Sequence, residues 1–222
     1  YTVVVEGNMD GIACDQAGIE NAVAVSGTAL TEEQLAMLRR YGKEMRFFFD
    51  MDEAGQKAAR RSTELALSQD IETFIISIPE GKDAADLAKD HPDALREAIS
   101  HPKPALAYFL DQTLRRFDIE TPSGKKEILA HFVPFIALAK NEIDRTYWIK
   151  ELSQAARVEE KYVYGVVQNT RVELEKRTQN LASPARNSSG GSDVLFTKRS
   201  ERLREELIGL MLAFSQIRSL QK

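Results

Sequence analysis

Short continuous apolar runs alternate with helical patterns over the first part of the chain. The runs cover residues 2–5, 22–25, 46–49 and 73–78, and their lack of alternation predicts strands that are covered on both faces. Helical spacing covers residues 11–18, 31–41 and 52–68 between these runs. The second helical pattern opens on a capping-box sequence, Thr31 to Gln34. Strand and helix alternation predicts an α/β fold with a mainly parallel sheet flanked by helices.

From about residue 92 onward only helical patterns remain, which predicts an all-α helical bundle. Helices are expected over residues 104–117, 121–140, 142–156 and 159–179. Thr121 and Pro122 supply a cap and a proline at the first helical position of the second, where Pro134 is expected to kink or split the helix. Residues 183–193 have the Ser- and Gly-rich composition of a flexible linker. Apolar residues then recur at helical spacing: Leu203, Leu207, Leu210, Phe214 and Ile217.

These patterns predict four segments. Residues 1–100 form the α/β domain, 101–181 the helical bundle, 182–193 the linker, and 194–222 the start of a further helical domain. The chain opens on Tyr1 and runs directly into an apolar strand, so we expect a piece of a longer protein whose N-terminal part is missing.

Composition narrows the classes of site. The single cysteine, Cys14, excludes an internal disulfide and a Cys-rich zinc site. No apolar stretch approaches the roughly 20 residues that a membrane span needs, and no signal segment precedes the first strand, so we expect a cytoplasmic protein. Residues 1–100 hold 19 acidic and 10 basic residues, whereas residues 101–222 hold 15 and 20. The acidic first half favours a cation site over a nucleic-acid groove.

Carboxylates follow the predicted strands at their C-terminal ends, where parallel sheets bind ligands. Glu6 follows the first run, Asp50 and Asp52 follow the third, and Asp83 follows the fourth after a short loop. Three such groups around one cleft would repel each other unless cations lie between them, and Mg²⁺ prefers a few carboxylates with water and phosphate. Two Mg²⁺ ions could activate a 3′-hydroxyl and stabilise a leaving pyrophosphate. Alternatively, Asp52 only caps the next helix and Glu6 is a solvated turn residue.

The sequence around these carboxylates resembles the TOPRIM signature of bacterial DNA primases. The motifs are EGNMDGI at 6–12, SGTAL at 26–30, FDMDEAGQKAARR at 49–61 and IPEGKDAADL at 78–87. The Glu and the Asp-x-Asp alone are shared with topoisomerases and some nucleases, whereas the other segments are more specific to primases. Residues 121–154 are similar to the helical segment that follows TOPRIM in primases, so the resemblance covers residues 1–170.

The resemblance implies DNA-templated synthesis of short RNA primers for replication, by Mg²⁺-dependent nucleotidyl transfer in which Mn²⁺ can substitute. Glu6 would act in catalysis or metal activation, Asp50 and Asp52 would be Mg²⁺ ligands with catalytic roles, and Asp10 and Asp83 would complete the cluster. The residues expected near the nucleotide phosphates are Gly7, Gly27, Thr28 and Lys57. For Lys57, a solvated helix face is the alternative.

The family also implies partners. These are a single-stranded DNA template, ribonucleoside triphosphates and the replicative helicase of the primosome, which the family binds through a C-terminal domain. Residues 194–222 hold only the start of that domain, so weak or no helicase binding is expected of this chain. Zinc is expected only in the N-terminal domain that the family carries upstream, and the chain is expected to be a monomer with little priming activity alone. Another TOPRIM enzyme (a nuclease or a topoisomerase) and a helicase-interaction module are the alternatives. A topoisomerase would need a nucleophilic tyrosine, and the candidate tyrosines lie in helical patterns: Tyr108, Tyr147, Tyr162 and Tyr164.

Three positions depart from the family pattern. Asn8 replaces the usual aromatic after Glu-Gly, and Met51 replaces the usual small residue between the two aspartates. The usual Asp-Pro-Asp is spelled Asp-Ala-Ala-Asp at 83–86, so the second carboxylate there is absent or shifted to Asp86.

Overall fold

The computed structural model describes residues 1–26, 29–78, 87–89 and 91–182. Several predicted features lie outside these residues. They are Gly27, Thr28, Asp83, Asp86, the linker and the segment 194–222. Residues 1–176 form one compact unit, and residues 177–222 are grouped as a second. The predicted segment boundaries at residues 100 and 181 stay predictions.

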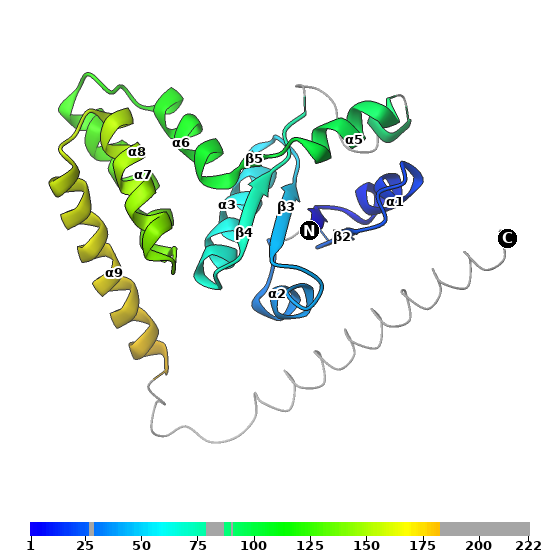
Figure 1. The fold of residues 1–222 in the computed structure, drawn as a ribbon, viewed down its shortest axis with the longest axis horizontal. Helices are drawn as coiled ribbons and strands as arrows, with labels where there is room; N and C mark the ends of the chain where they lie inside the picture. The colour runs from blue at the N-terminus through cyan, green and yellow to red at the C-terminus, as the bar shows by residue number, and fades with distance from the viewer. Residues whose placement is uncertain (27–28, 79–86, 90, 183–222) are drawn as a thin grey trace, which may run out of the picture. The chain divides into compact units, whose positions relative to one another are not determined.

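The first unit contains a five-stranded sheet. Its strands are β1 (Thr2–Val5), β2 (Ala22–Ala24), β3 (Glu44–Phe48), β4 (Glu72–Ile75) and β5 (Lys103–Pro104), in the order β2-β1-β3-β4-β5. The first four strands pair in parallel, which confirms the predicted α/β sheet (Figure 1). Strand β5 pairs antiparallel with β4 and was not predicted, because two residues carry no periodicity. Pro104 fits there because an edge strand tolerates a missing N–H.

Helices cover both faces of the sheet, as the continuous apolar runs predicted. Val3, Val5 and Phe48 pack with α1 (Asn8–Gln16) and α5 (Pro92–Ser100). Val4 and Phe47 belong to the opposite core, with α2 (Glu32–Leu38) and α3 (Glu53–Ser68). Adjacent residues of one strand point to opposite faces, so this split follows from the pleat.

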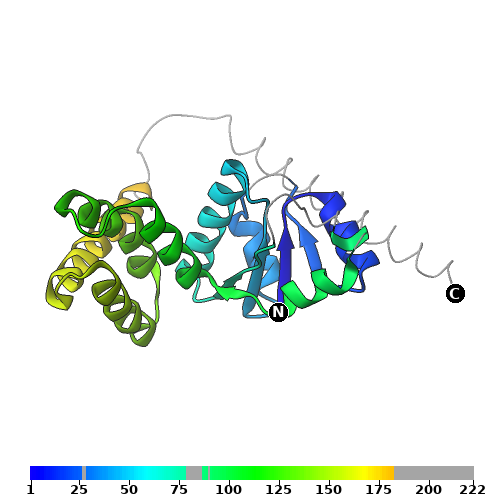
Figure 2. The ribbon, with the colours of Figure 1, turned by 90° about the horizontal axis from the view of Figure 1, so that it is seen from above.

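The predicted helical bundle is formed by α6 (Ala105–Arg116), α7 (Pro122–Leu138), α8 (Glu142–Ala156) and α9 (Glu160–Ala182). Figure 2 shows these helices gathered beside the sheet. Contacts of α7 with α3 and of α6 with β4 join the bundle to the sheet. Pro134 does not split α7, because the apolar residues on both sides of it are buried and hold the helix in the core. Within the described residues, none of the helices combines the length and apolar character that a bilayer crossing requires.

Candidate metal centre

The carboxylates of the first and third strands come together because those strands are neighbours. Val5 of β1 pairs with Phe48 of β3, so Glu6 and Asp50 both lie just beyond the C-terminal end of these parallel strands. The backbone N–H of Asp50 donates a hydrogen bond to the Glu6 carboxylate. The predicted meeting of these two loops is therefore confirmed by direct contact.

Glu6 lies in an unfavourable place for an anion. Its Oε2 atom is buried and finds no hydrogen-bond donor in the part of the chain that the structure describes. Burial raises the pKa of Glu6, and the negative charges of Asp50, Asp52 and Asp10 raise it further, although the Asp50 N–H acts in the opposite direction. A solvated turn residue would show none of this. The orphaned oxygen among like charges fits a bound divalent cation.

Asp52 has a structural role that was foreseen as an alternative. It is the N-cap of α3, and its Oδ1 accepts a hydrogen bond from the Gly55 N–H at 2.7 Å. The cap engages one oxygen of the carboxylate, and a carboxylate has two. The capping role and a cation on the other oxygen are therefore compatible.

The two roles of Asp52 can be separated by substitution. Serine retains a capping oxygen without the charge, so Asp52→Ser is expected to stay within about 0.5 kcal/mol of the parent free energy of unfolding. Asp52→Ala loses the cap and is expected to cost about 1 kcal/mol. Urea denaturation of the metal-free protein measures both values. An alanine variant as stable as the serine variant would contradict the capping role.

Asp10 holds the turn that follows Glu6. Its Oδ2 accepts a hydrogen bond from the Gly7 N–H at 2.9 Å and forms the capping box of α1. Helix α1 consequently begins at Asn8, three residues before the predicted start at residue 11, because this side-chain contact leaves no trace in apolar spacing. A Cβ atom on Gly7 would lie 3.1 Å from the same oxygen, so a larger residue there would require the Asp10 carboxylate to shift slightly. Metal ligation by Asp10 stays a prediction.

Lys57 lies on the solvent side of α3. Its Nζ atom is 2.6 Å from Oε1 of Glu53, and the two side chains are 65% and 85% exposed. This arrangement matches the solvated-face alternative, and a contact of Lys57 with nucleotide phosphate stays a prediction.

Met51 plays a part that the sequence did not reveal. It lies between the two aspartates and packs against the core, and its Sδ atom is 4.0 Å from the Tyr108 hydroxyl of α6. A contact with the helical bundle thus helps to hold the loop that carries the two aspartates. The only sequence signal was the departure from the small residue usual at this position.

The described residues contain no group of three or more His, Cys, Asp or Glu side chains close enough to hold a metal ion. Mg²⁺ needs only one or two protein carboxylates, because water and substrate phosphates complete its coordination. Glu6 and Asp50 therefore suffice for such a site, and their assignment as ligands stays a prediction.

Two family models match this chain. One is described as Toprim-like and matches residues 3–88, which include most of β1, all of β2 to β4, and the carboxylates Glu6, Asp50 and Asp52. The other is described as the DnaB-helicase binding domain of primase and matches residues 106–160. The second match falls on α6 to α8, inside the segment expected to belong to the polymerase core.

Curated relatives resemble the chain over most of its length. The DNA primase of Clostridium acetobutylicum is 27% identical over 221 residues, which are 98% of this chain and 36% of that protein. The DNA primase of Streptomyces coelicolor is 34% identical over 178 residues, 70% of this chain and 28% of that protein. The chain thus spans about a third of the length of these relatives.

Solved structures show the same fold. A DNA primase domain from Pseudomonas aeruginosa superposes with a TM-score of 0.66 at 32% identity, over 75% of this chain and 54% of that one. The DnaG primase catalytic domain bound to ssDNA superposes with a TM-score of 0.64 at 27% identity, over 72% and 52%. Sequence and fold therefore agree on one family.

Proposed function

Because this chain belongs to the bacterial DNA primase family, we propose that it supplies the metal-binding part of an enzyme that makes RNA primers on a DNA template. The observation that carries the proposal is the contact between Glu6 and Asp50 at the ends of β1 and β3, with one buried Glu6 oxygen unsatisfied among the described residues. A structural carboxylate would have a donor at that oxygen.

The reaction is nucleotidyl transfer, in which a 3′-hydroxyl attacks the α-phosphorus of a ribonucleoside triphosphate and pyrophosphate leaves. A divalent cation, Mg²⁺ or Mn²⁺, would lower the pKa of the hydroxyl and offset the charge of the pyrophosphate. Glu6 and Asp50 would hold it, with the uncapped oxygen of Asp52 as a further ligand. Asp83 is a candidate from outside the described residues.

The remaining residues position these groups. The sheet fixes the separation of Glu6 and Asp50, the Asp10 cap fixes the turn after Glu6, and the Tyr108 contact with Met51 steadies the aspartate loop. The residues proposed to lie near the nucleotide phosphates are Gly7, Gly27, Thr28 and Lys57. The template is single-stranded DNA, in keeping with the related catalytic domain bound to ssDNA, and the enzyme acts in the bacterial cytoplasm.

A second function is favoured by one specific observation. The model of the DnaB-helicase binding domain of primase matches residues 106–160, so we also propose that the chain contacts a replicative helicase. Nucleotidyl transfer and helicase contact are separate properties, because they involve different elements of the chain.

The nucleotidyl-transfer proposal can be tested by grafting this chain in place of the matched segment of the C. acetobutylicum DNA primase. The graft is expected to make RNA primers on single-stranded DNA with Mg²⁺. In the graft, Asp50→Asn should lower synthesis by about 100-fold, the upper end of the effect of groups that support a metal site. Glu53→Gln is the matched control, since Glu53 follows Asp52 as the first residue of α3 but is exposed and paired with Lys57, and it should stay within about twofold.

Two results would contradict the proposal. One is a graft that folds, as judged by circular dichroism, but makes no primers. The other is an Asp50→Asn graft as active as its parent. Cleavage of supercoiled DNA by the chain would instead favour a nuclease or topoisomerase activity.

A further inference from the structure

A groove of about 410 Å³ lies at the opposite end of the sheet from the carboxylates. Its walls are the C-terminal end of α3, the start of β4 and the first turns of α8, and we call it the α8 groove. Glu72 in its wall is the first residue of β4 and pairs with Glu44 at the start of β3. The metal centre follows the end of β3, so the two sites do not share side chains.

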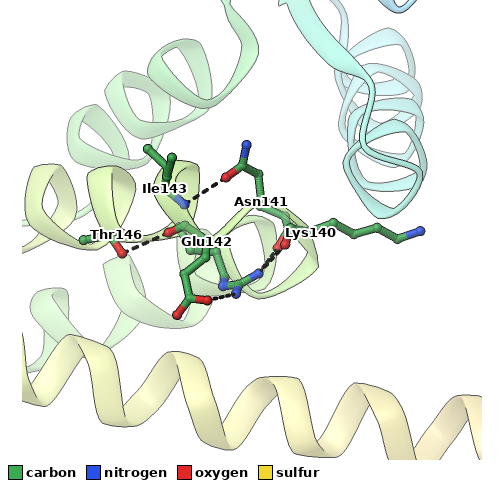
Figure 3. Close-up of polar contacts among 7 residues, drawn as sticks. Lys140, Asn141, Glu142, Ile143 and Thr146 are labelled. Atoms are coloured by element: carbon green, nitrogen blue, oxygen red, sulfur yellow. Dashed lines mark hydrogen bonds and ion pairs between the residues drawn. The ribbon is translucent and has the colours of Figure 1, made fainter.

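The α8 wall of the groove is held in place by its own hydrogen bonds. Arg145 is buried, and its Nη1 atom donates to the Ala139 and Lys140 carbonyls at 2.7 and 2.8 Å. The Asn141 side chain accepts from the Ile143 N–H at 2.9 Å and caps the helix. Figure 3 shows this network, with the Lys140 side chain extending away from it. A wall fixed in this way loses little conformational entropy when a partner binds.

Aromatic side chains give the groove an apolar surface. Tyr147 and Trp148 both line it, and Tyr147 is 54% exposed. Their rings lie edge to face at a centroid distance of 5.2 Å. Trp148 also packs on Phe132 of the core, so Tyr147 is the ring available to an incoming side chain. Exposed tyrosines of this kind are frequent anchors of protein interfaces.

The charges in the groove define what it can bind. Three carboxylates line it, and the single basic side chain among the lining residues is Lys140; the carboxylates are Asp70, Glu72 and Asp144. This surplus of negative charge would repel the phosphates of a nucleic acid. It would attract a polypeptide segment that places an apolar side chain on Tyr147 and carries Lys or Arg beside it.

We propose that the α8 groove is the docking site for such a basic, apolar segment of the replicative helicase. The choice of partner rests on the helicase contact proposed above, because the helicase-binding family model matches residues 106–160 and so covers all of α8. This places the contact on α8 and not only on the predicted segment 194–222.

Binding of the full chain to a purified DnaB-type helicase, measured by biolayer interferometry, tests the assignment. Tyr147→Ala should weaken binding about tenfold or more, as loss of an interface anchor does. The double variant Glu72→Lys with Asp144→Lys should weaken it about tenfold, most strongly at low ionic strength. Tyr164→Ala is the matched control, because Tyr164 is 53% exposed on α9 and does not line the groove, and it should bind within about twofold of the parent.

Each other outcome overturns the assignment. Equal binding by all variants would place the helicase elsewhere, and failure of the parent chain to bind would remove the helicase as occupant. A parent dimer that Tyr147→Ala dissociates, seen by sedimentation, would make a second copy of the chain the occupant. Competition by single-stranded DNA that requires Tyr147 would make it a nucleic-acid site. None of these results would affect the primer-synthesis test, which reports on the metal centre alone.

Discussion

Replacing Glu6 by glutamine is expected to stabilise the metal-free protein by about 1 kcal/mol and to abolish its metal binding. The Glu6 side chain is half-buried, its buried Oε2 has no donor in the described part of the chain, and three aspartates repel its charge. Glutamine keeps the size and removes the charge, so the cost of burying an anion disappears. A carboxylate that destabilises its own fold and keeps one buried oxygen without a donor among the described residues is typical of a functional site.

The pH dependence of this gain has a definite sign. The folded-state pKa of Glu6 is raised above its ordinary value of 4.5, so the folded protein retains the proton where the unfolded chain has lost it. The parent therefore loses stability as the pH rises from the unfolded toward the folded pKa. The advantage of Glu6→Gln should be present at pH 7 and absent well below pH 4.5.

Urea denaturation at both pH values measures the stability gain, and electron paramagnetic resonance of Mn²⁺ measures the binding. Glu173→Gln on α9 serves as the control, because Glu173 is exposed and lies far along the chain from the site. Its stability and Mn²⁺ binding should match those of the parent. A Glu6→Gln variant that is less stable at pH 7, or that binds Mn²⁺ as the parent does, would show that the carboxylate has a structural role instead.

Replacing Gly55 by alanine is expected to destabilise the protein by about 3 kcal/mol. A Cβ atom there would lie 2.2 Å from the carbonyl oxygen of Asp50, and 2.9 and 3.0 Å from its carbonyl carbon and nitrogen. All three are backbone atoms, so relief requires the whole loop between β3 and α3 to move. That loop carries Asp50 and Asp52, so Mn²⁺ binding should fall together with stability.

Gly165 provides the matched comparison for this substitution. It lies inside α9, and a Cβ atom there would meet nothing within 4 Å. Gly165→Ala should raise the free energy of unfolding by about 0.5–1 kcal/mol, because alanine loses less backbone freedom in a helix. Denaturant midpoints compare the two variants. Equal midpoints for Gly55→Ala and the parent would rule out the close approach to Asp50.

The sequence predicted the parts of the fold that depend on apolar periodicity. The strands β1 to β4 overlap the predicted apolar runs, although β3 begins at Glu44 and β4 at Glu72, and the meeting of Glu6 with Asp50 followed once both were placed at strand ends. It did not predict β5 or the start of α1, which depend on edge pairing and on one side-chain cap. Nor could it predict the contact between Met51 and Tyr108, because 57 positions separate them and no pattern links the two.

The capping carboxylate shows a different limit. Both interpretations of Asp52 were available from its position before α3, and the structure confirms the cap without excluding a cation. The Asp52→Ser and Asp52→Ala variants vary the charge and the cap separately, so they distinguish cation binding from helix capping.

Helix α3 also acts as a spacer between the two proposed sites. Asp52 caps its first turn at the metal centre, and Leu67 in its last turn lines the α8 groove. Its 16 residues set these ends about 24 Å apart along the axis. Inserting or deleting one residue would turn one end by about 100° relative to the other. The side chains on the solvent face of α3 can therefore vary, but its length cannot change without misaligning the metal centre and the groove.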